Sequence, residues 1–157
     1  MKKTISIFSV ICLLFLLCSC GTVTEVKSAK KYIKKIYDYE INHKEEVVYI
    51  DLRITGVDDT TNVNEYAYNH LLDAVNYNFE KGNKEEFLYW VQSVSKKEQT
   101  IFLFDSGNNE SSEVASWLES DGYNKIYYFT GSYMELREHE LFDKLLIEVS
   151  GTEGCDC

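Results

Sequence analysis

Short apolar runs recur along the chain and mark its strands. Three of them, at residues 47–52, 101–104 and 126–129, are rich in β-branched and aromatic side chains and contain few polar positions. Runs of this length that lack an alternating polar face are typical of strands buried on both sides of a sheet. A weaker run at 74–77 predicts one more short strand.

Between these runs, apolar residues recur at the spacing of one helix face. This pattern predicts helices at 29–41, 83–95 and 111–121, and Gly122 stands where a residue that ends a helix in the left-handed conformation belongs. The remaining pattern predicts a loop at 56–63, a short helix at 65–72 and a last helix at 134–148.

Strands and helices therefore alternate over residues 31–149, which we interpret as one α/β domain with a central parallel sheet and helices on both faces. In such sheets a ligand binds beyond the carboxyl ends of the strands. Two polar segments fall at such ends: Asp51-Leu52-Arg53, and the strand-to-helix junction at 104–111. A helix start offers free backbone N–H groups that favour an anion. Yet this junction is bracketed by the carboxylates of Asp105 and Glu110.

Residues 1–19 have the features of a bacterial lipoprotein signal peptide. Two lysines precede an apolar run at 5–17 that is short for a membrane span, and the run ends in Leu17-Cys18-Ser19-Cys20-Gly21. This ending resembles a lipobox, which implies cleavage before Cys20 and acylation of its thiol and new amino group. Several acyl chains would hold the protein on the bacterial cell membrane, outside the cytoplasm, with residues 20–30 as a polar tether. The alternative is an ordinary secretory signal with an incidental cysteine.

The mature chain is strongly acidic. The full sequence has 16 basic and 26 acidic residues, and loss of Lys2 and Lys3 with the signal leaves 14 against 26, a formal charge of −12. This charge argues against a nucleic-acid partner and against electrostatic adhesion to anionic lipid. It is typical of a soluble domain that a tether holds away from the membrane.

The mature chain has few free thiols. Cys12 and Cys18 leave with the signal and Cys20 is the acylated residue, so Cys155 and Cys157 remain, in a predicted flexible tail at 150–157. No internal disulfide framework is therefore expected. Two thiols separated by one residue can form a strained disulfide, relay a persulfide or bind a soft metal. The alternative is a frayed tail whose cysteines are incidental.

The order of these segments resembles a rhodanese-like domain. The resemblance covers roughly residues 30–136, and four pieces carry it in the family's order and spacing. The first is VVYIDLR at 47–53, which resembles the family's first strand ending in Asp-x-Arg. The second is NHLLDAVN at 69–76, in which His70, Ala74 and Asn76 match the family's Gly-His-Ile-Pro-Gly-Ala-x-Asn. The other two are the strand, six-residue loop and helix at 100–123, and the strand and turn at 124–136.

The loop departs from the family where its chemistry occurs. In active members, the resemblance implies, the loop begins with a cysteine that accepts sulfur as a persulfide and often ends in arginine. A carboxylate cannot carry a sulfane sulfur, because this transfer needs a thiolate nucleophile. Phosphatase chemistry on this fold also needs the loop cysteine, and inactive rhodanese domains that are paired with active ones often carry Asp at this position. We therefore predict a degenerate loop without a catalytic residue, in which the carboxylates of the loop occupy the place of an anion at the helix start. The loop consists of Asp105, Ser106, Gly107, Asn108, Asn109 and Glu110.

The remaining candidates have weaker functional patterns. Asp51 and Arg53 are pocket candidates that either pair with each other, orient the pocket loops or contact a ligand; His70 is a further pocket candidate or a structural residue before a turn. The three histidines lack metal-ligand spacing, and residues 105–116 lack the glycine and glutamate that a calcium loop requires. We therefore predict no metal and no cofactor.

These features predict a membrane-anchored, non-catalytic binding or scaffolding module. Its partners would be the membrane, through the lipid anchor, and another protein outside the cytoplasm. The alternative is a thiol or persulfide relay that uses Cys155 and Cys157 in place of the missing loop cysteine. A third interpretation is a surface protein of unrelated role that kept the fold for stability.

Overall fold

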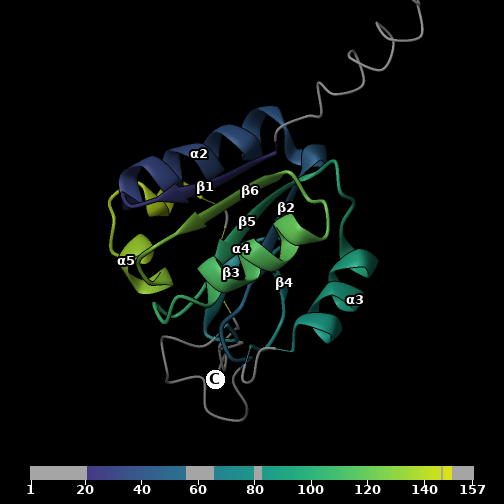
Figure 1. The fold of residues 1–157 in the computed structure, drawn as a ribbon. Coiled ribbons are helices and arrows are strands. Elements are labelled where there is room, and N and C mark those ends of the chain that lie inside the picture. The colour runs from purple at the N-terminus through teal and green to yellow at the C-terminus, as the bar shows by residue number, and fades with distance from the viewer. Residues whose placement is uncertain (1–20, 56–65, 80–82, 146, 150–157) are drawn as a thin grey trace, which may run out of the picture.

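The computed structural model describes residues 21–55, 66–79, 83–145 and 147–149. They form an α/β fold around a central five-stranded sheet (Figure 1). All five strands are parallel, and across the sheet they follow the order β1 (Thr22–Val26), β6 (Lys125–Phe129), β5 (Thr100–Phe104), β2 (Val47–Asp51) and β4 (Val75–Asn76). Two further strands, β3 (Asn69–Leu71) and β7 (Ile147–Val149), pair antiparallel beside it. The predicted α/β class with a parallel sheet is confirmed.

Helices cover both faces of the sheet, as predicted. Alternate side chains of β5 point to opposite faces, because successive residues of a strand do so. Phe102 and Phe104 belong to one buried cluster with residues of the first and last helices, and Ile101 and Leu103 belong to a second cluster with residues of the two middle helices. These helices are α2 (Ala29–Asn42) and α5 (Tyr133–Arg137) on the first face, and α3 (Lys84–Val94) and α4 (Glu110–Ser120) on the second.

Most helices begin at a local polar cap. The side chain of Asn83 accepts hydrogen bonds from the amides of the first turn of α3, and Ser132 forms a reciprocal capping box with Glu135 at the start of α5. Helix α4 differs, because its N-cap residue Asn109 has a left-handed backbone and makes no capping bond with its side chain. A residue from further upstream, Asp105, takes over this role.

The segment predicted as a tether is partly a strand. Residues 20–30 contain β1 and the start of α2, so part of the predicted tether belongs to the folded domain. Strand β1 pairs with β6 from Thr22 opposite Lys125 to Val26 opposite Phe129. Its alternating threonines and valines suit a half-buried edge strand, but they form no continuous apolar run that would mark it in the sequence.

Two predicted helices are wrong. The range 65–72 contains β3, which pairs with β7 from far along the chain. The range 134–148 divides into the rest of α5, a short 3₁₀ helix η2 (Phe142–Lys144) and most of β7. Helical spacing of its apolar residues arose because several of them reach one core from separate short elements. A second 3₁₀ helix, η1 (Lys44–Glu46), precedes β2. The predicted loop at 56–63 lies outside the described residues.

Candidate functional site

The junction between β5 and α4 is closed by its own first side chain. Asp105 follows directly after β5 and is only 3% exposed. One carboxylate oxygen, Oδ1, accepts a hydrogen bond from the amide of Gly107 at 2.7 Å, and Oδ2 accepts one from the amide of Ser111 at 2.8 Å. The carboxylate thus bonds both the loop and the first turn of α4, where backbone N–H groups and the helix dipole favour negative charge.

The loop backbone is shaped for this closure. Gly107 and Asn109 both adopt positive φ values, 93° and 68°, which turn the chain back toward the helix start. A side chain at position 107 would also crowd the chain, because a Cβ there would lie 3.1 Å from the Cβ of Ser132. The carbonyl oxygen of Asp105 accepts a 2.8 Å hydrogen bond from the amide of Tyr133, which ties the loop to α5.

Glu110 adds a second carboxylate at the helix start. Its Oε1 accepts a 3.2 Å hydrogen bond from the side chain of Asn108, while Oε2 is buried without a hydrogen-bond partner among the described residues. Burial raises the pKa of Glu110, the negative charge of Asp105 raises it further, and the bond from Asn108 opposes the shift. The adjacent Ser111 hydroxyl is also buried and without a partner in the described part of the chain.

A small cavity lies beside the loop. It has a volume of about 190 Å³ and is lined from β1, β6, the turn after β6 and the start of α4. Its lining includes Glu25, Asn109, Ser112 and Thr130 but no basic side chain. Glu25 pairs with Lys27, and no basic side chain lines the cavity, so the cavity offers no unpaired positive charge to an anionic ligand.

Asp51 and Arg53 form a buried pair. The two side chains are 0% and 1% exposed, and Arg53 Nη2 lies 2.6 Å from Asp51 Oδ2 while Nε lies 2.9 Å from Oδ1. The guanidinium also donates to the carbonyl of Asn69 at 2.7 Å and stacks on the ring of Tyr133, 3.5 Å from its centroid. The sequence left three roles open for Asp51 and Arg53. The described geometry fits two of them, pairing with each other and positioning neighbouring segments.

The side chain of Asn76 also holds the backbone of the Asp51–Arg53 segment. Its amide Nδ2 donates to the carbonyls of Asp51 and Arg53 at 2.9 and 2.8 Å. His70 lies on β3, half-buried, with Nδ1 3.1 Å from the carbonyl oxygen of Tyr66 and its ring stacked 3.9 Å from the Tyr66 ring. These contacts suit a structural histidine, the alternative that the sequence left open.

The structure links the two sequence-predicted segments through a residue that sequence reasoning missed. Tyr133 stacks on Arg53 with its ring and donates to the Asp105 carbonyl with its amide. Its hydroxyl is buried and burial raises its pKa, while the positive charge of Arg53 opposes the shift. The signal in the sequence was an aromatic residue directly after the turn that follows the strand at 126–129, although only the fold shows what it contacts.

Other predicted residues lie outside the described part. Cys20, Cys155 and Cys157 are among them. Within the described ranges, no group of three or more histidine, cysteine or acidic side chains gathers in a way that could hold a metal ion. No helix of the described part is both long and apolar enough to cross a bilayer.

The chain is similar to several solved structures. A full-length protein from Lactobacillus plantarum is 13% identical, with 90% of this chain and 98% of that chain covered at a TM-score of 0.53. A protein from Bacillus halodurans is 14% identical over 91% and 86% of the two chains, at a TM-score of 0.52. A rhodanese-like domain from Anabaena is 14% identical over 80% and 83%, also at 0.52. At these identities the likeness concerns the fold alone.

Sequence comparison gives the family. No curated protein sequence matches the chain. The sequence profile of the rhodanese-like domain matches residues 29–139, which is more than half of the chain. The matched range includes the Asp51–Arg53 pair and the loop after β5. The chain therefore belongs to the rhodanese-like domain family.

Proposed function

We propose that this protein is a membrane-anchored rhodanese-like module that acts outside the cytoplasm by binding another protein, without sulfurtransferase catalysis. The observation that carries the proposal is the loop. Its first residue is Asp105, and both carboxylate oxygens accept hydrogen bonds from the loop and helix amides. A sulfur acceptor would need a thiolate at this position, stabilised by the same amides.

The carboxylates also oppose the substrates of such chemistry. Thiosulfate and other sulfur donors are anions, and the loop presents two carboxylates, one of them with a buried oxygen that lacks a hydrogen-bond partner among the described residues. The amides that would bind an anion already have an internal acceptor. The module is therefore suited to recognition through its surface rather than to turnover in its loop.

A sulfurtransferase assay tests this proposal. Wild-type protein should show no thiosulfate:cyanide sulfurtransferase turnover above background. Asp105→Cys alone should restore little, because Glu110 would still oppose a thiolate and an anionic donor. Asp105→Cys with Glu110→Arg should restore more and should lower the pKa of the new thiol relative to the single variant, because the nearby charge changes sign. Robust wild-type turnover that survives loss of both tail cysteines would refute the assignment of the loop.

The anchor needs its own test. The short apolar run that ends at Cys20 supports processing as a lipoprotein. The mature protein should partition with membranes and begin at an acylated Cys20, and Cys20→Ala should leave the protein unprocessed or release it. Mass spectrometry of the mature N-terminus reads out both the cleavage site and the acyl chains. Normal processing and membrane retention of the variant would contradict the anchor.

A second candidate function uses the tail cysteines as a thiol or persulfide relay. The pairing of β7 with β3 supports it, because Val149 lies opposite Asn69, whose carbonyl accepts a hydrogen bond from Arg53. Arg53 in turn stacks on Tyr133, the residue that bonds the loop. Val149 is thus linked to the loop through a series of contacts, and the six residues from 150 to Cys155 span at most about 20 Å when extended.

Mild polysulfide treatment separates the two functions. A relay predicts a persulfide adduct or a reversible disulfide at the two tail cysteines, because a thiolate attacks a sulfane sulfur and displaces the shortened polysulfide. It also predicts that Cys155→Ser with Cys157→Ser abolishes an activity of the intact protein. Absence of any adduct or disulfide, under conditions that modify a control peptide, would leave the binding module as the function.

A further inference from the structure

The chain has an acidic net charge but contains one cluster of basic residues. Five lysines fall within residues 27–35, a stretch of nine residues without any acidic side chain, although the whole chain carries a formal charge of −10. Lys27 directly follows β1, and the other four lysines lie in the first half of α2. We call them the basic face; it consists of Lys27, Lys30, Lys31, Lys34 and Lys35.

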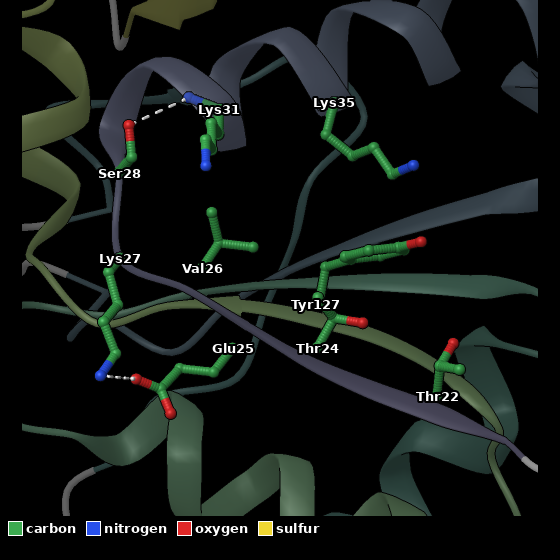
Figure 2. Close-up of a pocket in the computed structure, with 9 residues that line it drawn as sticks. All are labelled: Thr22, Thr24, Glu25, Val26, Lys27, Ser28, Lys31, Lys35 and Tyr127. Atoms are coloured by element: carbon green, nitrogen blue, oxygen red, sulfur yellow. Dashed lines mark hydrogen bonds and ion pairs between the residues drawn. The ribbon is translucent and has the colours of Figure 1, made fainter.

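The basic face borders a large open groove between α2 and the edge strand β1. The groove has a volume of about 710 Å³. Figure 2 shows its two sides: Thr22, Thr24 and Val26 come from β1, and Lys31 and Lys35 come from α2 above them. Lys31 points toward the strand, and the ammonium group of Lys35 lies 5.1 Å from the centre of the Tyr127 ring.

Little negative charge balances these lysines. The single acidic residue of the groove lining is Glu25, which pairs with Lys27 at 3.2 Å. Among the described residues, no acidic side chain forms an ion pair with the four lysines of α2. Four neighbouring cations on one helix repel each other, so a surface that supplies phosphate groups would relieve this repulsion.

The position of the groove in the chain indicates what covers it. Thr22 lines the groove and follows Cys20 after one intervening residue, so it lies within about 7 Å of an acylated Cys20. Strand β1 is the outermost strand of the described sheet, so one of its edges pairs with no other described strand. With so short a connection, the domain has to rest on the lipid surface rather than hang far from it.

Exposed apolar side chains extend the same helix. Tyr37 is 42% exposed and Ile41 is 60% exposed on α2. Tyr37 and Lys34 also line one smaller cavity together. A helix that presents lysines together with exposed aromatic and aliphatic side chains is typical of a surface that lies in the headgroup region of a membrane.

We infer that the basic face docks on anionic phospholipid headgroups of the membrane that carries the anchor, and thereby fixes the orientation of the domain. The inference rests on the proposed membrane anchoring and adds the recognised lipid chemistry to it. The acidic remainder of the domain is repelled by the same lipids, so attraction and repulsion favour one orientation. The opposite side of the molecule, including α3, then faces outward and is available to a protein partner.

The test measures lysine accessibility in the intact lipoprotein. The mature protein is inserted into vesicles of phosphatidylcholine alone, or of phosphatidylcholine mixed with an equal amount of phosphatidylglycerol, and is treated with a water-soluble amine acylating reagent. We expect Lys27, Lys31 and Lys35 to react about five-fold more slowly on the anionic vesicles, the effect of one surface lysine on an anionic membrane. The exposed Lys84, the first residue of α3, and Lys96, shortly after its end, should react equally on both.

Salt and charge variants sharpen the comparison. High salt should abolish the protection, because it screens the headgroup charge. Lys31→Gln with Lys35→Gln should remove the protection of Lys27, whereas the matched control Lys84→Gln with Lys96→Gln should preserve it. Equal reaction rates on both vesicle types would overturn the inference and leave the anchor intact.

Two further outcomes contradict the inference in distinguishable ways. Protection on neutral vesicles by inorganic phosphate alone, equal to that on anionic vesicles, would identify the groove as a site for a soluble anion and overturn docking on lipid. Failure of the protein to insert into neutral vesicles at all would contradict the acyl anchor and, with it, the inference.

Discussion

Replacement of Asp105 by alanine is the sharpest test of how the loop is held. The carboxylate accepts two hydrogen bonds, from the amides of Gly107 and Ser111, and is almost completely buried. A hydrogen bond to a charged group contributes about 1.5–3 kcal/mol to stability, and its loss leaves a backbone donor without its partner. Relief of the repulsion between Asp105 and Glu110 offsets a small part of this loss. We therefore expect Asp105→Ala to lower the free energy of unfolding by about 2–5 kcal/mol.

Two further variants serve as references for the loss of stability expected in Asp105→Ala. Asp105→Asn keeps one oxygen acceptor but turns an amide NH₂ toward the second backbone donor, so it should lose about half as much, about 1–3 kcal/mol. Asp143→Ala removes an exposed carboxylate of η2 and should change stability by less than about 0.5 kcal/mol. Urea unfolding followed by tryptophan fluorescence measures all three, because Trp117 is buried on α4, directly after the loop.

Hydrogen exchange checks the mechanism separately from the magnitude. In Asp105→Ala the amides of Gly107 and Ser111 should exchange faster relative to those in the middle of β5, because their acceptor is gone. Stability of Asp105→Ala within about 0.5 kcal/mol of the wild type would refute the interpretation of the carboxylate as the cap of α4. A large loss of stability with unchanged protection of both amides would refute it as well.

Three further predictions follow from the same geometry. Arg53→Ala should lower the free energy of unfolding by about 3–5 kcal/mol in urea titrations, because it leaves the buried carboxylate of Asp51 without its cation; a loss below about 1 kcal/mol would contradict a buried ion pair. The raised pKa of Glu110 means that the folded state holds its proton more tightly than the unfolded state, so wild-type stability falls relative to Glu110→Gln as the pH rises above about 4.5; a difference that is constant across pH, measured by thermal unfolding, would argue against the burial of this group. Gly107→Ala should destabilise the protein more than Gly122→Ala, because both glycines have positive φ but only position 107 lacks room for a methyl group; equal melting temperatures would contradict the crowding.

The sequence by itself determined the centre of the fold. The apolar runs of β2, β5 and β6 are strands that pack on both faces, so their burial leaves a continuous pattern that needs no knowledge of neighbours. Helices α2, α3 and α4 likewise follow from the spacing of their own apolar residues. The absence of a cysteine at the start of the loop is also a fact of the sequence alone.

Only the tertiary structure decided the elements whose partners are distant in the chain. Strand β1 forms because β6, about 100 residues later, supplies its hydrogen bonds, and β3 and β7 form for each other across a similar separation. A short polar strand gains too little from its own side chains to be recognised locally, since cross-strand pairing provides most of its stability.

The same distinction holds for the site. The sequence placed two carboxylates at a helix start and an Asp-x-Arg segment at a strand end, but it could not say what these charges contact. The fold brings the Asp105 carboxylate onto the amides of Gly107 and Ser111, and it brings Tyr133 between Arg53 and the loop. The sequence already clusters the lysines of α2, but only the fold places them beside the edge strand, and the net charge of the chain gave the opposite expectation for this surface. Hydrogen bonds and electrostatic forces depend on distances of a few ångströms, and composition and spacing do not fix such distances between segments that only folding brings together.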